Sequence, residues 1–105
     1  MINRRVALSP RAEADLESIV VWISEHGAPL AALAYAARIR SYLAGFAQFA
    51  ERGSMRDDIA VGFRIIGFER RVTIAFVVRD DRVEIERVFY GGQDWEAALR
   101  NESDD

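Results

Sequence analysis

Three consecutive strands are predicted between Gly62 and Trp95, and they constrain the fold more than any other part of the chain. The second and third strands meet at a two-residue turn, Asp80-Asp81, which pairs Arg79 with Arg82. The same register places three apolar pairs on one face: Val78 with Val83, Phe76 with Ile85 and Val72 with Phe89. A slip of one residue would turn all of these side chains toward solvent. The segment therefore predicts an antiparallel sheet with one buried face.

The opposite face of the same strands is predicted to be polar and exposed to solvent. Its charged and hydroxyl-bearing side chains are Arg64, Arg71, Thr73, Arg79, Glu84, Glu86 and Tyr90. Val61, Phe63 and Ile65 are assigned to the apolar face. Arg87 breaks the pattern, because the register places it on the apolar face opposite Ile74. A charge at that position requires a partner, so we expect a structural ion pair or an edge position that reaches solvent.

Two amphipathic helices precede the sheet. The first is predicted from Pro10 to His26, with Ser9 as its N-cap and Gly27 as a left-handed C-terminal cap. The second is predicted from Pro29 to Arg52, and Gly45 is a weak point within it. Because only a short link joins the two helices, they are expected to form an antiparallel hairpin.

The complete order of elements is predicted to be β-α-α-β-β-β-α. A short strand from Arg4 to Leu8 comes first, and a short helix from Gln93 or Asp94 to Arg100 comes last. With 105 residues, the chain fits one domain over residues 1–100, and the acidic tail at 101–105 is expected to fray. The hairpin should cover one face of a small, mostly antiparallel sheet, which is an α+β two-layer fold.

The composition excludes several classes of function. Cysteine is absent, so the chain has no disulfide, thiolate nucleophile or cysteine metal site. No apolar run reaches the roughly 18 residues of a membrane span, and we expect a cytoplasmic protein. Every Lys/Arg position is an arginine, 14 in all, yet the net charge is −3. Because the chain has no overall basic field, we expect no direct nucleic-acid binding, although a local arginine patch remains open.

Sequence motifs for cofactors and metals are absent, so we expect neither a cofactor nor a metal. There is no P-loop, dinucleotide fingerprint, HExxH motif or Cys/His cluster. His26 is the only histidine, and its place in a last helical turn favours a structural role. On the polar sheet face, arginine could bind phosphate while glutamate or Tyr90 moves protons, which would allow RNA cleavage. Cross-strand ion pairs explain the same residues more simply.

Four segments, taken in order, form a pattern that points to one family. Val6 to Ile19 resembles that family's first strand and the start of its first helix. Gly62-Phe63-Arg64 resembles its G-x-R strand, and Val72 to Asp81 resembles its central hairpin. Ile85 to Asp94 resembles the ending of one branch, with Tyr90 in place of a frequent histidine. Over nearly its whole length the chain resembles the toxins of the ParE/RelE superfamily of type II toxin–antitoxin systems, and its ending resembles the ParE branch.

The two branches of this family imply different activities. RelE-like members cut mRNA on the ribosome with several basic residues and a C-terminal tyrosine. Arg64 matches the family arginine of G-x-R, but Gln93 stands near the place of a later arginine, and no tyrosine follows Trp95. ParE-like members are associated with plasmid stabilisation and with poisoning DNA gyrase by binding. The resemblance therefore implies a gyrase-binding toxin that is not an enzyme, and the alternatives are a RelE-like endonuclease and an inactive antitoxin-binding homologue.

The resemblance also implies a ParD-like antitoxin that forms a hetero-oligomer with the toxin. Such antitoxins lay a helical and then an extended segment on the toxin, and both helix-in-groove binding and strand addition suit this architecture. Arg64 and Arg71 are candidates for binding antitoxin carboxylates. The candidate partner-binding residues are Trp22, Tyr35, Tyr42, Arg64, Arg71, Tyr90 and Trp95. No residue is assigned a catalytic role.

Overall fold

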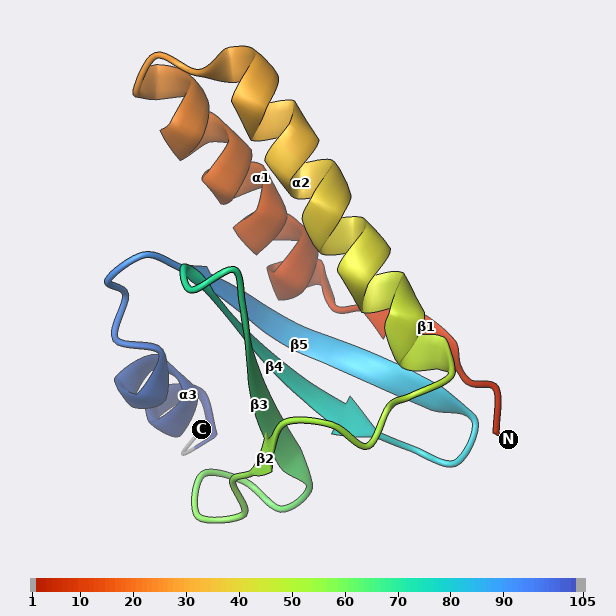
Figure 1. The fold of residues 1–105 in the computed structure, drawn as a ribbon. Helices are drawn as coiled ribbons and strands as arrows, with labels where there is room; N and C mark the ends of the chain where they lie inside the picture. Colours follow the sequence, from red (N-terminus) through yellow and green to blue (C-terminus); the bar gives the residue numbers. More distant parts are fainter. Residues whose placement is uncertain (1, 104–105) are drawn as a thin grey trace.

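The computed structural model describes residues 2–103 and has two main layers, a helical hairpin and a five-stranded sheet (Figure 1). The elements are β1 (Arg5–Leu8), α1 (Pro10–Glu25), α2 (Pro29–Ala44), η1 (Gly45–Ala47), β2 (Ser54–Met55), β3 (Phe63–Phe68), β4 (Val72–Val78), β5 (Arg82–Tyr90) and α3 (Trp95–Ser103). The strand order is β1-β5-β4-β3-β2, in which only the β1–β5 pair is parallel. The predicted α+β two-layer fold is confirmed. Within the described part of the chain, no helix has the length and apolar character needed to cross a membrane.

The hairpin begins with a capped helix. Ser9 Oγ accepts a hydrogen bond from the Ala12 N–H at 3.0 Å, which satisfies one of the free N–H groups at the start of α1. The same hydroxyl donates to the Glu86 carbonyl oxygen at 2.8 Å, so Ser9 also ties α1 to strand β5. At the other end, α1 stops at Glu25, and Gly27 has a φ of +88°, as predicted for a left-handed cap.

Helix α2 is shorter than the sequence predicts. The prediction extends it to Arg52, but the helix ends at Ala44 and a single 3-10 turn, η1, follows it. Gly45, the first residue of that turn, has a low helix propensity. The chain then turns back toward the N-terminal strand, where the Arg4 N–H donates to the Ala47 carbonyl oxygen at 2.7 Å. A tertiary hydrogen bond therefore replaces the helical bonds that the sequence pattern suggested.

The β4–β5 hairpin follows the predicted register near its turn and departs from it further along. The pairs Val78 with Val83 and Phe76 with Ile85 match the prediction. A β-bulge beside Phe76 leaves Glu86 out of the ladder, and beyond it the register shifts by one residue. Val72 therefore pairs with Tyr90 and not with Phe89. Tyr90, assigned to the polar face, turns toward the hairpin, and Phe89 turns away from it.

The bulge also explains the anomaly at Arg87. Arg87 pairs with Ala75 and not with Ile74, so it leaves the face that packs against the hairpin. Its guanidinium donates two hydrogen bonds of 2.8 and 3.0 Å to the Asp15 carboxylate and one of 2.6 Å to Glu102. The predicted structural ion pair is confirmed, and it joins α1, β5 and α3.

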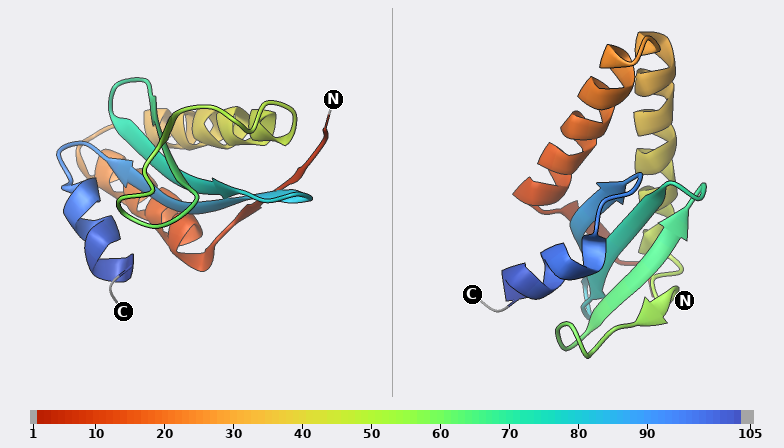
Figure 2. Two further views of the ribbon diagram at one scale, coloured as in Figure 1. Left: turned by 90° about the horizontal axis from the view of Figure 1, so that it is seen from below. Right: turned by 90° about the vertical axis from the view of Figure 1, so that its left-hand side faces the viewer.

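Buried side chains form two clusters, one on each face of the sheet. The larger lies between the hairpin and the sheet and includes Leu16, Ile19, Tyr35, Ile39, Leu43, Phe46, Val72, Ile74, Phe76 and Ile85. The smaller cluster packs against α3, which lies on the side of the sheet away from the hairpin (Figure 2), and consists of Ile59, Ala75, Phe89 and Leu99. The prediction of one solvated face is therefore wrong. Because the C-terminal helix returns across the second face, both faces bury apolar side chains.

Strand β3 presents its side chains in the opposite sense to the prediction. Arg64 pairs with the buried Phe76, which places Arg64 on the hairpin side of the sheet. Phe63 and Ile65 pack instead on the cluster beside α3. Val61 precedes the strand and is 91% exposed. Alternation in the sequence separates two sets of side chains but does not tell which set faces the helices.

The C-terminal helix is longer than predicted. Helix α3 begins at Trp95, where Asp94 Oδ1 accepts a hydrogen bond from the Ala97 N–H at 3.1 Å. It runs to Ser103, so residues 101–103 of the predicted acidic tail are helical. Residues 104–105, the rest of that tail, lie outside the described residues.

Candidate partner-binding site

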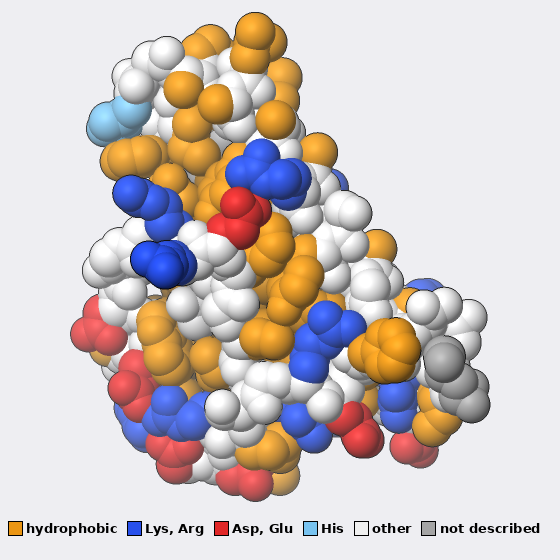
Figure 3. All heavy atoms as spheres, viewed as in Figure 1, with side chains coloured by type: hydrophobic (Ala, Val, Ile, Leu, Met, Phe, Trp, Pro, Cys, Tyr) orange, Lys and Arg blue, Asp and Glu red, His pale blue; other side chains and the backbone are white. Residues whose placement is uncertain are grey.

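A hollow in the surface lies where the closed end of the α1–α2 hairpin, near the link between the two helices, faces the start of β4 and the end of β5, beside a gathering of hydrophobic and basic side chains (Figure 3). Two adjoining cavities of about 690 and 600 Å³ occupy this hollow. Trp22, Arg71 and Tyr90 line both cavities, and Tyr35 lines the second. We call the surface formed by these four residues the aromatic groove. All four are predicted partner-binding residues, and the fold brings them together from α1, α2, the β3–β4 turn and β5.

Aromatic rings contact one another across the groove. The Trp22 ring stacks on His26, one helical turn further on, with ring centroids 3.8 Å apart and an interplanar angle of 20°. Tyr90 lies 5.7 Å from Trp22 and 5.9 Å from Tyr35 between centroids, in the tilted and edge-on geometries that aromatic pairs favour. Trp22 is nevertheless 48% exposed. A half-exposed tryptophan held in place by neighbouring rings is typical of an interface hot spot.

Arginines give the groove a positively charged rim. Arg38 on α2 donates hydrogen bonds of 3.0 and 3.3 Å to the two carboxylate oxygens of Glu69 in the β3–β4 turn. The Arg38 Cζ atom also lies 5.0 Å from the centre of the Tyr35 ring. Arg70 and Arg71 follow Glu69 and are both exposed. Three arginines against one glutamate make the rim complementary to a carboxylate or another anion.

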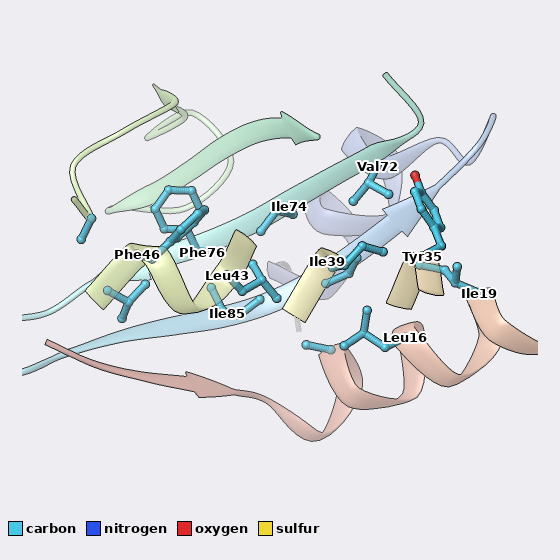
Figure 4. Close-up of a cluster of buried hydrophobic side chains, with 14 residues drawn as sticks. Leu16, Ile19, Tyr35, Ile39, Leu43, Phe46, Val72, Ile74, Phe76 and Ile85 are labelled. Atoms are coloured by element: carbon cyan, nitrogen blue, oxygen red, sulfur yellow. The ribbon is translucent and has the colours of Figure 1, made fainter. Parts of the chain in front are cut away.

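Tyr35 is the buried member of the groove. Its side chain is 9% exposed, and its hydroxyl has no hydrogen-bond partner among residues 2–103. Figure 4 shows it at the edge of the larger cluster, with its hydroxyl directed toward the segment that enters β4. Burial raises the pKa of this hydroxyl, and Tyr90 and Glu69 raise it further, while Arg38 and Arg71 oppose them. The Tyr35 hydroxyl is therefore protonated at neutral pH and available as a hydrogen-bond donor.

Two further predicted residues, Tyr42 and Arg64, lie along the junction of α2 and β3. Tyr42 stacks on Phe68 with ring centroids 4.6 Å apart. Arg52 lies over the Tyr42 ring at 5.7 Å, and its carbonyl oxygen accepts a hydrogen bond of 3.3 Å from Arg64. We call Tyr42, Arg52, Arg64 and Phe68 the α2–β3 seam. All four side chains are half-buried, so the seam offers apolar and basic surface to a partner as well.

Trp95, the last predicted residue, belongs to neither surface. It packs on the cluster of Ile59 and Leu99 beside α3, and the Arg56 Cζ atom lies 5.6 Å from its ring centre. These contacts give Trp95 a part in holding α3 against the sheet. The seven predicted residues thus divide into four in the groove, two in the seam and one on the far face.

Three further side chains line the second cavity beside the groove and were not predicted as partner-binding residues: His26, Arg38 and Glu69. Arg38 follows Tyr35 by three positions and so lies beside it on the helix, which the sequence spacing could have indicated. His26 follows Trp22 by four positions for the same reason. Glu69 lies in the β3–β4 turn, 31 positions from Arg38, and no local sequence pattern predicts the contact between these two residues.

The residues proposed for RNA cleavage are not assembled into one site. Arg64 pairs with Phe76 and Glu84 with Val77, so Arg64 and Glu84 point to opposite faces of the sheet. Arg79 binds Glu84 across the β4–β5 turn and lowers the pKa of that carboxyl, which confirms a cross-strand ion pair. Within residues 2–103, no group of three side chains is arranged to hold a metal ion.

Comparison with known proteins identifies the family. The family model described as the ParE toxin of type II toxin–antitoxin system, parDE, matches residues 6–95. Among solved structures, the chain is similar to one described as the chromosomal ParDE TA system from P. aeruginosa, with a TM-score of 0.73 and 24% identity over 84% of this chain and 96% of that chain. A comparison with curated proteins gave no match. Because the family match extends from β1 to the start of α3, the chain belongs to the ParE toxin family of type II toxin–antitoxin systems.

Proposed function

We propose that a ParD-like antitoxin neutralises this toxin by binding across the aromatic groove and the α2–β3 seam, in a toxin–antitoxin hetero-oligomer. The observation that carries the proposal is Trp22, which is 48% exposed while it stacks on His26 and contacts Tyr90. Tryptophan, tyrosine and arginine are the residues most often found at interface hot spots. A partner that covers the groove would remove apolar surface from water and bring carboxylates to the arginines of the rim.

A helical antitoxin segment suits the groove better than an added strand. On the outer edge of β5, the Val88 N–H donates to Asp15 Oδ2 and the Tyr90 N–H donates to Gln93 Oε1, both at 2.8 Å. These two side chains already occupy the backbone donors that an added strand would require. A segment lying beside β5 would therefore bind mainly through its side chains.

Replacing Trp22 tests the antitoxin site. We expect Trp22→Ala to weaken binding of the antitoxin encoded beside the toxin by about 30-fold or more, as for a hot-spot residue. Isothermal titration calorimetry measures the dissociation constant. Val61→Ala is the control, because Val61 is 91% exposed but lines neither cavity of the groove. Unchanged affinity for Trp22→Ala, or an equal loss for Val61→Ala, contradicts the proposed site.

We further propose that the free toxin acts in the cytoplasm by binding DNA gyrase and not by catalysis of its own. Three observations support this. The net charge is −3, lysine is absent, and the residues considered for RNA cleavage lie on both faces of the sheet. A site that cleaves RNA needs phosphate-binding and proton-transferring groups on one surface, within reach of one scissile bond.

A supercoiling assay with purified gyrase separates the candidate activities. The proposal expects excess toxin to inhibit supercoiling or to trap a DNA-cleavage complex, and expects antitoxin to reverse the effect. Intact supercoiling together with mRNA cleavage on ribosomes would identify the RelE-like activity instead. Intact supercoiling and intact mRNA, with antitoxin still bound, would identify an inactive antitoxin-binding homologue.

A further inference from the structure

The Arg38–Glu69 ion pair lies beside a buried hydroxyl that it does not satisfy. Arg38 contacts the Tyr35 ring and Glu69 together, so it links helix α2 to the β3–β4 turn next to Tyr35. Its side chain is 53% exposed and that of Glu69 is 40% exposed, so a competing carboxylate could reach the pair. The Tyr35 hydroxyl nearby is a buried donor with no acceptor among residues 2–103.

The turn that presents Glu69 is held in an unfavourable backbone conformation. Glu69 has a φ of 50° and Arg70 a φ of 66°, both in the left-handed region. The turn has three residues, 69–71, and positions with positive φ in turns usually carry Gly, Asn or Asp, because those residues adopt positive φ readily. Backbone strain of this kind is concentrated at ligand sites and switches. In this turn, the strained backbone holds the Glu69 carboxylate against Arg38.

Arg71 adds a second cation to the same place. It lines both cavities of the groove, and it forms no ion pair with another residue in the range 2–103. Arg38, Arg71 and the Tyr35 hydroxyl are all donors, and Glu69 is the acidic side chain among the residues that line the second cavity. The local chemistry is therefore that of a carboxylate-binding subsite with an internal carboxylate at one side of it.

We propose that Glu69 is a placeholder in a carboxylate-binding subsite, and that an acidic side chain of the antitoxin displaces it. The incoming carboxylate binds Arg38 and Arg71 and accepts a hydrogen bond from the Tyr35 hydroxyl, which the departure of Glu69 makes reachable. The identity of the partner rests on the proposed antitoxin function, whereas the subsite itself does not.

Sodium acetate tests the subsite on the free toxin, without any antitoxin. We compare thermal unfolding in acetate and in sodium chloride at equal ionic strength and neutral pH. In Glu69→Gln, acetate should raise the unfolding temperature beyond the effect of chloride, because bound ligand stabilises the folded state. This acetate-specific rise in unfolding temperature should be at least twofold larger in Glu69→Gln than in the wild type, where Glu69 competes with acetate. Combining Tyr35→Phe with Glu69→Gln should remove most of the rise.

Glu13→Gln is the matched control for this experiment. Glu13 binds Arg40 with hydrogen bonds of 2.8 and 3.3 Å, and the two side chains are 48% and 52% exposed, much like the Glu69–Arg38 pair. Freeing Arg40 creates an exposed arginine that lines neither cavity of the groove. An equal response to acetate in Glu13→Gln and Glu69→Gln overturns the subsite.

Antitoxin binding tests whether Glu69 competes with the partner. The dissociation constant should fall several-fold in Glu69→Gln, and it should rise about fivefold in Tyr35→Phe, the effect of losing one hydrogen bond. Unchanged or weaker binding of Glu69→Gln overturns the placeholder role. If neither wild type nor variants bind antitoxin, the proposed function fails, and the acetate experiment still decides the subsite.

Discussion

Arg87 provides a direct test of how the two ends of the chain are held together. Its side chain is 14% exposed, and its partners Asp15 and Glu102 are 15% and 26% exposed. Removing one member of a fully buried pair costs about 3–5 kcal/mol, because the other charge is left unpaired. Without Arg87, Asp15 retains its hydrogen bond from the Val88 N–H and some contact with solvent. We therefore expect loss of the Arg87–Asp15 pair to lower the free energy of unfolding by about 2 kcal/mol. The more exposed Glu102 pair adds up to about 1 kcal/mol.

Arg87→Met is the variant of choice, because methionine can still pack on Phe89, over which the Arg87 Cζ atom lies at 4.5 Å. The free energy of unfolding should fall by about 3 kcal/mol in urea denaturation. For a domain of this size, that corresponds to a fall of about 12–24 °C in the unfolding temperature.

Two further variants show whether the unpaired charge causes the loss. Asp15→Asn combined with Arg87→Met removes both charges and keeps an acceptor for the Val88 N–H, so it should recover at least about 1 kcal/mol relative to Arg87→Met. Arg40→Met removes an exposed ion pair with Glu13 and should cost less than about 1 kcal/mol. If Arg87→Met loses no more than Arg40→Met, or if the double variant recovers nothing, the reasoning is refuted.

Three more predictions follow from the backbone and from burial. Arg70→Gly should raise the free energy of unfolding by about 1 kcal/mol in urea denaturation, because glycine adopts a φ of 66° without strain. A lower free energy of unfolding would show that contacts of the Arg70 side chain stabilise the fold by more than the backbone strain costs. Gly53→Ala should destabilise by several kcal/mol in the same assay, because Gly53 has a φ of +73° and a Cβ there would overlap the Ile65 carbonyl oxygen; a neutral effect would contradict this geometry. Burial raises the pKa of Glu86, so the folded state holds that proton more tightly than the unfolded state, and stability falls as pH rises through this window. Glu86→Gln should therefore be more stable than the wild type at pH 7, and the gain should vanish on acidification below the ordinary glutamate pKa; a gain that persists in acid would exclude ionisation as its cause.

Local sequence patterns were sufficient wherever a few neighbouring residues decide the structure. Ser9 and Pro10 set the start of α1, and Gly27 sets its end, because capping depends on residues within one helical turn. The Asp80-Asp81 turn fixed the first pairs of the β4–β5 hairpin for the same reason. Residue type alone predicted the aromatic and arginine side chains of the groove as partner-binding residues. The sequence did not predict that these side chains lie next to one another.

The bulge at Glu86 shows where local patterns fail. Alternation places Arg87 on the hairpin face, and one extra residue in β5 moves it to the other face and exchanges the roles of Tyr90 and Phe89. The bulge is stabilised by the Ser9 hydroxyl, which donates to the Glu86 carbonyl oxygen from a position 77 residues earlier in the chain. No window along the sequence contains both partners of that bond.

By itself, the sequence determined the order of the main elements, the helical hairpin, the three antiparallel strands and the resemblance to the ParE branch, because periodicity, caps and turns act over short distances. It did not indicate the short elements η1 and β2. Tertiary structure decided which face each strand presents, since α3 covers a face that alternation alone would leave to solvent. It also decided the site: Glu69 meets Arg38 from 31 positions away, and Tyr90 meets Trp22 and Tyr35 only after the bulge turns it toward the hairpin. These contacts depend on how the layers pack, and packing is set by the whole chain.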